Sequence, residues 1–214
     1  MTTPATLDLA EFRLLRALRE QGGEGPFTQL WNAQAGHTWS VLRGVFGRDE
    51  EALGWMASFR VELAQRATSF RLEEALAAQV GQALYGHVHA ALPEGGMLPW
   101  GPLAPTPLGV AELPQRTRLG YLVDLFFDWT PPDPSVRVAY SLLEPAADTN
   151  ARLVVYAACL RSPPASALIF PAGVPPQPAP TPGRARLLLV FGLLVAMIVT
   201  FMVLWWQVPV RSAG

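Results

Sequence analysis

The chain has 214 residues, of which 50% are hydrophobic and 15% are charged, so it is not disordered throughout. All 16 basic residues are arginine and they are matched by 17 acidic residues, which excludes the strongly cationic signature of a nucleic-acid binder. Cys159 is the only cysteine, which excludes an internal disulfide framework and sites built on several thiolates, and we expect no cofactor.

Four helices are predicted in the first 92 residues. Asp8 and Glu11 form a capping box for a first helix that stops at Gly22 and Gly23. A second helix is predicted over 27–46, a third from Asp49 onward, and a fourth from 69 toward 92. The apolar residues at helical spacing are Leu9, Phe12, Leu15 and Leu18, then Phe27, Leu30, Trp31, Trp39, Leu42 and Val45, then Leu53, Met56, Phe59 and Leu63, and finally Leu72, Leu76, Val80 and Leu84.

A stretch rich in proline and glycine at 93–109 separates these helices from three shorter ones. The pattern predicts helices over 115–127, 135–143 and 149–160, the last behind Asp148 as its N-cap. Pro145 divides the second from the third. Two short helices across a tight connection, backed by another, outline a helix-turn-helix.

The next segment, 162–183, has 8 prolines in 22 residues, too many for a helix or a sheet. It is typical of a semi-rigid spacer.

Residues Leu187 to Val210 follow without a charge over 24 residues, enough to span a bilayer as a helix. Trp205 and Trp206 stand near one end, where indole rings favour the headgroup layer. Two arginines shortly before the span and one after it give a small positive-inside bias that places the N-terminal part in the cytoplasm.

The sequence therefore predicts an all-α protein in five segments. These are a helical domain at 1–92, a linker at 93–113, a helix-turn-helix-like domain at 114–161, a Pro-rich linker at 162–186 and one transmembrane helix at 187–210.

Two parts of the chain resemble the extracytoplasmic-function sigma factors of bacterial RNA polymerase. The first runs from residue 13 to 53, and its matching positions are Phe27, Leu30, Trp31, Gly47, Asp49, Glu50 and Glu51. The second, 138–160, is similar to the family's promoter-reading helix-turn-helix, with Ala139, Leu142, Pro145, Arg152, Leu153 and Leu160 on its usual residues. The resemblance covers about residues 10–161 and implies a bacterial protein. Together with the predicted span, this gives the inner membrane as the expected location.

The chain departs from that family where the family holds DNA. Residues 72–115 contain no basic residue, and 1–183 carry 13 arginines against 17 acidic residues, a net charge near −4. In the helix that would read bases, Val154 and Val155 replace polar side chains, which leaves Arg152 and Asn150 as the candidates for DNA contact. Because phosphate neutralisation and base readout both need donors, we expect DNA binding to be weak or lost.

The resemblance also implies a partner-binding surface. In the family, the helix matching the third predicted helix and the one before it dock on the polymerase. Trp55, Arg60 and Glu62 are the candidates for contact here, since exposed Trp and Arg often dominate interfaces, whereas Met56 and Phe59 are assigned to the core.

The preferred hypothesis is a membrane-anchored, divergent sigma-factor-like protein that acts by protein contact in transcription regulation. Its expected partners are core RNA polymerase or a subunit of a membrane complex, together with the lipid bilayer. One alternative is a functional membrane-tethered sigma factor released by proteolysis, and another is a scaffold subunit unconnected with transcription. No enzyme is expected, because no nucleophile, base and carboxylate stand together in sequence, and His87 and His89 point too far apart on a helix to share a metal.

Overall fold

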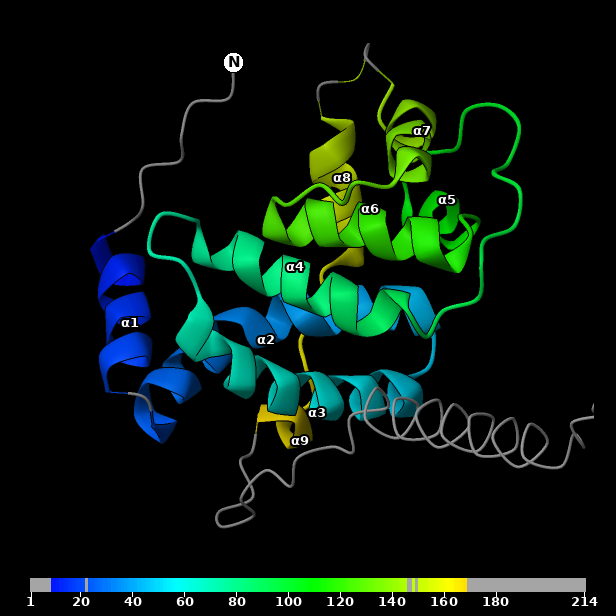
Figure 1. Ribbon diagram of the computed structural model, residues 1–214. Coiled ribbons are helices and arrows are strands. Elements are labelled where there is room, and N and C mark those ends of the chain that lie inside the picture. Colours follow the sequence, from blue (N-terminus) through cyan, green and yellow to red (C-terminus); the bar gives the residue numbers. More distant parts are fainter. Residues whose placement is uncertain (1–8, 22, 146–147, 149, 169–214) are drawn as a thin grey trace, which may run out of the picture. The chain divides into compact units, whose positions relative to one another are not determined.

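The computed structural model describes residues 9–168 except 22, 146–147 and 149, and this part of the chain is all-helical, as predicted (Figure 1). It contains no strand. The elements are α1 (Leu9–Glu20), α2 (Glu24–Phe46), α3 (Asp49–Arg66), the 3₁₀ turn η1 (Ala67–Ser69), α4 (Leu76–His89), α5 (Pro107–Ala111), α6 (Gln115–Phe127), α7 (Pro134–Leu143), α8 (Ala151–Cys159) and α9 (Ala165–Leu168).

The glycine and proline residues that are expected to end or begin helices do so close to the predicted positions. Gly47 takes the left-handed conformation, φ +72°, and its N–H donates to the Arg43 carbonyl, which ends α2. Pro134 occupies the first turn of α7 and the carboxylate of Asp133 accepts from the Ser135 N–H. The cap of α8 differs from the prediction, because Asn150 holds that position and the Asp148 carboxylate accepts the Asn150 N–H at 2.9 Å.

The first helix buries less than its pattern indicated. Leu15 and Leu18 are buried, but Leu9 is 61% and Phe12 is 37% exposed. The reason is that α1 packs mainly against α2 and η1, which leaves part of its apolar stripe exposed.

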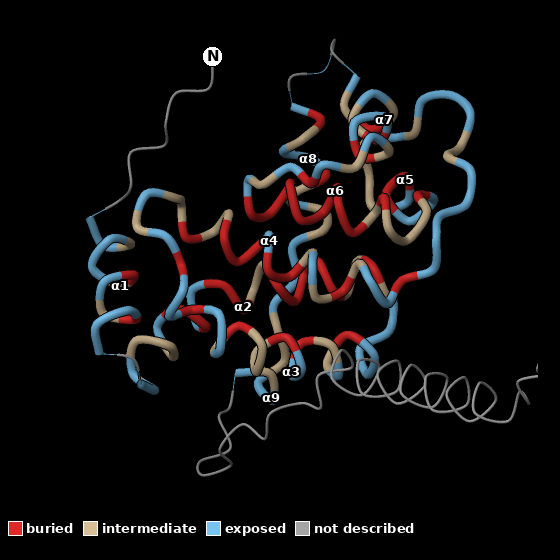
Figure 2. The backbone as a smooth tube through the Cα atoms, viewed as in Figure 1, coloured by how far each residue is buried: buried red, intermediate tan, exposed pale blue. Residues whose placement is uncertain are grey.

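Helix α6 lies at the centre of the core, beside α2, α4 and α7 (Figures 1 and 2). Its residues from Leu119 to Phe127 are all buried, including the aromatic rings of Tyr121 and Phe127. A helix segment that is buried on every side must be enclosed by neighbours, so this part of α6 packs with α2 and α4 rather than standing apart from them.

The predicted segments 1–92 and 114–161 pack together in the described residues, because α6 lies against α2 and α4. The described helices belong to one compact unit, Met1–Phe170. The predicted linker at 93–113 also contains structure: α5 lies within it, and the Leu103 N–H donates to the Leu142 carbonyl at 2.9 Å.

The start of the predicted Pro-rich linker at 162–186 packs on the helical unit. The Arg161 N–H donates to the Ser40 hydroxyl at 2.9 Å, and the Trp31 indole N–H donates to the Ala167 carbonyl at 3.3 Å. Residues 161–168 thus cross α2 and bring α9 against α2 and α3.

The predicted membrane span lies outside the described residues, as do Leu187, Trp205, Trp206 and Val210. Within the part of the chain that the structure describes, no helix combines the length and the apolar character needed to cross a bilayer.

Two glycines of α4 are expected to respond oppositely to alanine. A Cβ at Gly81 would lie 2.6 Å from Phe127 Cβ, so Gly81→Ala should lower the free energy of unfolding by about 1–3 kcal/mol. A Cβ at Gly86 would meet nothing within 4 Å, so Gly86→Ala should raise that free energy by about 0.5–1 kcal/mol. Chemical denaturation of the full chain in detergent measures both, and two changes of the same sign would contradict the packing described.

Candidate functional site

Arg152, one of the two candidates for DNA contact, is half-buried and bonded to α6. Its Nη2 lies 2.7 Å from the Asp124 Oδ2 and donates at 3.1 Å to the backbone carbonyl of the same residue. Its Nη1 lies 3.6 Å from Glu144 Oε1, which also accepts the Tyr121 hydroxyl at 2.8 Å. This network, the α6–α8 network, ties α8 to α6 and to the end of α7.

Burial lowers the pKa of the Arg152 guanidinium, but the hydrogen bond and the negative charge of Asp124 outweigh that effect and hold the pKa above its ordinary value. Asp124 is 4% exposed, so its charge depends on this partner. The Arg152 guanidinium is therefore used in bonds within the helical unit.

The outer face of α8 is apolar where a DNA reader needs donors. Leu153 is 66% and Val154 is 46% exposed, while Asn150 stands exposed before the first turn. Neither aliphatic side chain can neutralise a phosphate or bond to a base edge.

Two further arginines near this region are also bonded internally. Arg118 donates to the carbonyls of Ala111 and Leu113, the latter at 2.8 Å. Arg116 donates to the Leu92 carbonyl at 2.8 Å. Each guanidinium supplies a donor to backbone carbonyls at a turn of the chain. These two charges therefore stabilise loops rather than form an open cationic surface.

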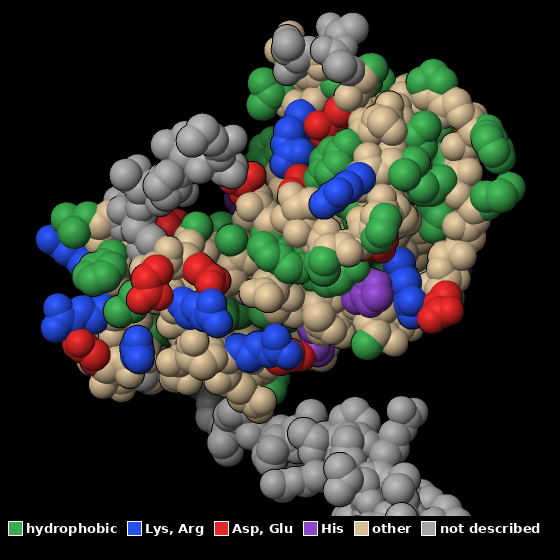
Figure 3. Space-filling view, turned by 45° about the horizontal axis from the view of Figure 1, so that its top comes forward, with side chains coloured by type: hydrophobic (Ala, Val, Ile, Leu, Met, Phe, Trp, Pro, Cys, Tyr) green, Lys and Arg blue, Asp and Glu red, His purple; other side chains and the backbone are tan. Residues whose placement is uncertain are grey.

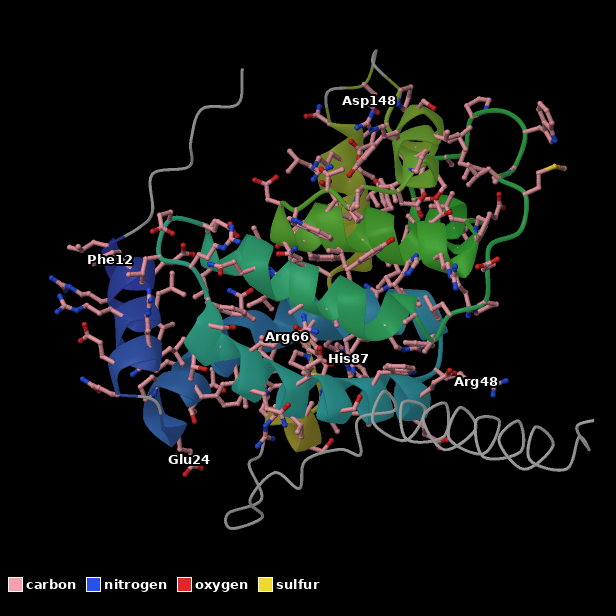
Figure 4. The ribbon with its side chains drawn as sticks, viewed as in Figure 1. Phe12, Glu24, Arg48, Arg66, His87 and Asp148 are labelled. Carbon is pink, nitrogen blue, oxygen red and sulfur yellow. The ribbon has the colours of Figure 1, made fainter. Side chains whose placement is uncertain are left out.

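Trp55 and Glu62, two of the three candidates for partner contact, lie on one face of α3 toward α4. Trp55 stacks on Phe46 with ring centres 5.4 Å apart, and its ring meets the edge of His87 at 5.5 Å. Glu62 pairs with His87 Nδ1 and, at 2.6 Å, with Arg66 (Figure 4). Both are half-buried and already bonded within the unit.

Arg60, the third candidate, faces away from Glu62, because residues two positions apart on a helix point about 200° from each other. It shares a cavity of about 250 Å³ with Leu53, Met56 and α9. Burial lowers the pKa of its guanidinium, and the nearby charge of Glu24 opposes that shift. The three candidates thus do not form one surface, whereas Met56 and Phe59 are buried, as predicted.

The sequence did not reveal that His87 joins Ser58 and Glu62, which are far from it along the chain. The Ser58 hydroxyl lies 2.9 Å from His87 Nε2, and Glu62 pairs with Nδ1. The order of groups is that of a nucleophile, a base and a carboxylate. However, Ser58 lies inside α3 and its hydroxyl donates to the Trp55 carbonyl at 3.0 Å, so the neighbouring N–H groups belong to helical hydrogen bonds and cannot hold an oxyanion.

We name Ser58, Glu62 and His87 the His87 cluster. Its contacts act as a clip, because they hold α4 against α3. The sequence favours a solvated or partly packed His87, and in the structure its side chain is 16% exposed. The described residues contain no group of three or more His, Cys, Asp and Glu side chains arranged for a metal ion.

A second, half-buried histidine is expected to make stability depend on pH. His37 lies against Phe126 and Phe127, and its Nε2 is 3.1 Å from the Tyr156 hydroxyl. Burial lowers the pKa of His37, and burial together with Arg116 lowers that of His89. The unfolded chain therefore binds these protons first, so the free energy of unfolding should fall as pH falls below about 6.5 and approaches the folded pKa.

Replacing His37 by glutamine should flatten this dependence. The measurement is urea unfolding of the full chain in detergent at pH 7.5 and pH 5.5, followed by tryptophan fluorescence. An unchanged difference between the two pH values in His37→Gln would contradict the assignment, because His89 alone would then account for it.

Comparisons with family models, with curated proteins and with solved structures find no match for this chain. The chemistry of the described side chains is therefore the main basis for a functional proposal.

Proposed function

We propose that this chain is a membrane-anchored, divergent sigma-factor-like protein that acts by protein contact in transcription regulation, with DNA binding weak or lost. Its helical unit would stand on the cytoplasmic side of a bacterial inner membrane, with core RNA polymerase or a subunit of a membrane complex as partner. The observation that carries the proposal is the exposed apolar face of α8, Leu153 and Val154, beside an arginine bound to Asp124.

The charge arrangement supports contact with protein rather than with a duplex. DNA affinity rests largely on cations that displace counterions from phosphates. Among the described residues after residue 100, Arg116, Arg118 and Arg152 are bonded internally, and the arginines that are exposed there are Arg137 and Arg161. Two such charges are few compared with the several phosphate contacts of a typical DNA reader.

The apolar face fits a protein partner. Exposed aliphatic side chains on a helix are suited to a hydrophobic groove, where their burial contributes affinity. Tyr156 and Val155 pack inward on the same helix, so the outward direction of Leu153 and Val154 is set by the fold.

The test uses the full chain in lipid nanodiscs against purified core RNA polymerase. Leu153→Ser combined with Val154→Ser should weaken binding at least tenfold, since residues that dominate interfaces contribute at this level. Leu9→Ser is the matched control, because Leu9 is 61% exposed on α1, far along the chain from α8. Equal loss in the control, or no loss in the double variant, would overturn the α8 assignment.

A DNA titration of the same preparation separates the alternatives. We expect weak binding with little change between about 50 and 200 mM salt. Steep salt dependence together with promoter-specific initiation would favour the tethered sigma factor released by proteolysis. A purified membrane complex that binds the chain while polymerase does not would favour the scaffold alternative.

A further inference from the structure

The connection between α4 and α5 carries large apolar side chains that the unit does not use. We name residues 95–108, which comprise most of this connection and the first two residues of α5, the apolar loop. Trp100 is 89%, Met97 is 80% and Leu108 is 77% exposed, the highest values for large hydrophobic residues in the described part of the chain. Figure 3 shows hydrophobic side chains gathered over the edge of the unit that this connection forms.

The fold fixes the direction of these side chains. Leu98 and Leu103 pack against the core, and the Leu103 N–H donates to the Leu142 carbonyl at 2.9 Å. Between them Gly101 takes φ +91°, a turn that favours glycine, directly after Trp100. The loop is thus held on both sides of the turn while its tip points outward.

The chemistry of the loop is suited to lipid. No charged residue occurs from 95 to 111, so entry into an apolar layer would not desolvate an ion. Pro99, Pro102, Pro105 and Pro107 have no N–H, which removes donors that would otherwise need partners there. Tryptophan favours the boundary between headgroups and acyl chains.

We propose that the apolar loop inserts Met97, Trp100 and Leu108 into the interfacial layer of the bilayer that anchors the chain. This inference rests on the proposed membrane anchoring. The 18 residues between Leu168 and Leu187 reach at most about 70 Å, which exceeds the roughly 40 Å size of a compact unit of about 160 residues. The tether therefore permits contact and raises the effective concentration of the loop at the lipid surface.

Lipid is favoured over a protein partner because the loop offers little that a protein interface uses. Protein interfaces surround their apolar centre with a polar rim and direct hydrogen bonds. The charge that adjoins the loop in the chain is that of Glu94, which is 90% exposed and lies 3.6 Å from Arg116. A headgroup layer, in contrast, accepts an uncharged apolar tip without specific polar partners.

The experiment measures the depth of the loop in the membrane. The full chain carrying Cys159→Ala receives one cysteine at a time, Met97→Cys, Trp100→Cys or the control Glu73→Cys, and an environment-sensitive fluorophore. Glu73 is also exposed on a loop, the one before α4. Each protein is reconstituted in phosphatidylcholine vesicles with no other protein present, and lipid-borne nitroxide and aqueous iodide serve as quenchers.

Labels at 97 and 100 should be quenched by nitroxide lipid at least twofold more than the label at 73, and less by iodide. If iodide quenches all three labels equally while the chain floats with the vesicles, the loop inference fails and the anchoring stands; the exposed tip then serves a protein partner. A chain that does not float with vesicles overturns both. The double variant Met97→Ser with Trp100→Ser should still float, because the anchor is intact, but should leave a label at residue 108 as accessible to iodide as the control.

Discussion

Replacing Asp124 by alanine is expected to lower the free energy of unfolding by about 3 kcal/mol. The substitution leaves the Arg152 guanidinium without its main partner and removes the acceptor of the Thr130 hydroxyl. Breaking a buried ion pair costs about 3–5 kcal/mol, and the lower end applies because the Arg152 side chain is 37% exposed. Urea denaturation of the full chain in detergent gives the value.

Two comparisons make this prediction specific to the α6–α8 network. Replacing both partners with apolar residues, Asp124→Leu with Arg152→Met, should cost less than Asp124→Ala, because no charge is then left unpaired. The surface variant Glu73→Ala should stay within about 0.5 kcal/mol of the native chain. A double variant that is less stable than Asp124→Ala would show that the network is not what holds α8 in place.

The network also explains why the sequence could indicate the helices here but not the role of their arginine. The periodicity of 115–127 and 135–143 depends on local patterns, and the structure places α6 and α7 within one residue of those ranges. Whether Arg152 faces outward depends on Asp124, which lies 28 residues earlier on another helix. The spacing of apolar residues within one helix carries no information about a contact between two helices.

The packing between the predicted segments 1–92 and 114–161 could not be predicted for a related reason. Pro and Gly mark breaks in helices, and the stretch at 93–109 does break the chain between α4 and α5. A break in secondary structure is not a break in packing, because α6 returns to fill the space between α2 and α4. The run from Leu119 to Phe127, in which Asp124 is the single charged residue, is the signal in the sequence that could have shown this, since a helix segment that is apolar on nearly all sides needs neighbours on nearly all sides.

Candidate contacts on α3 illustrate a limit of residue type as a guide. Tryptophan often dominates interfaces, yet Trp55 and its neighbour Glu62 are both bonded around His87 within the unit. On α8, by contrast, the exposed residues are Leu153 and Val154, which composition alone would place in a core. On these two helices, the exposed Leu153 and Val154, rather than Trp55 or Glu62, therefore mark the surface that is open to a partner.

Replacing Phe59 by alanine should have a still larger effect and lower the free energy of unfolding by about 3–5 kcal/mol. The ring is fully buried on the inner face of α3 and lies 5.7 Å from the His87 ring, centre to centre. Its loss would leave a cavity and would also remove a wall of the His87 cluster, so the clip between α3 and α4 should loosen. Chemical denaturation measures the first effect, and hydrogen exchange of α3 and α4 measures the second.

Matched variants separate the cavity from a general weakness of α3. Phe59→Leu keeps most of the apolar volume and should cost about 1–2 kcal/mol, whereas Gln65→Ala, on the exposed side of the same helix, should stay within about 0.5 kcal/mol. If Phe59→Ala cost no more than Phe59→Leu, the ring would not be filling a closed space. If Phe59→Ala lowered stability without faster exchange in α4, the His87 cluster would not depend on that wall, and the coupling between the two helices would have to run through α6 instead.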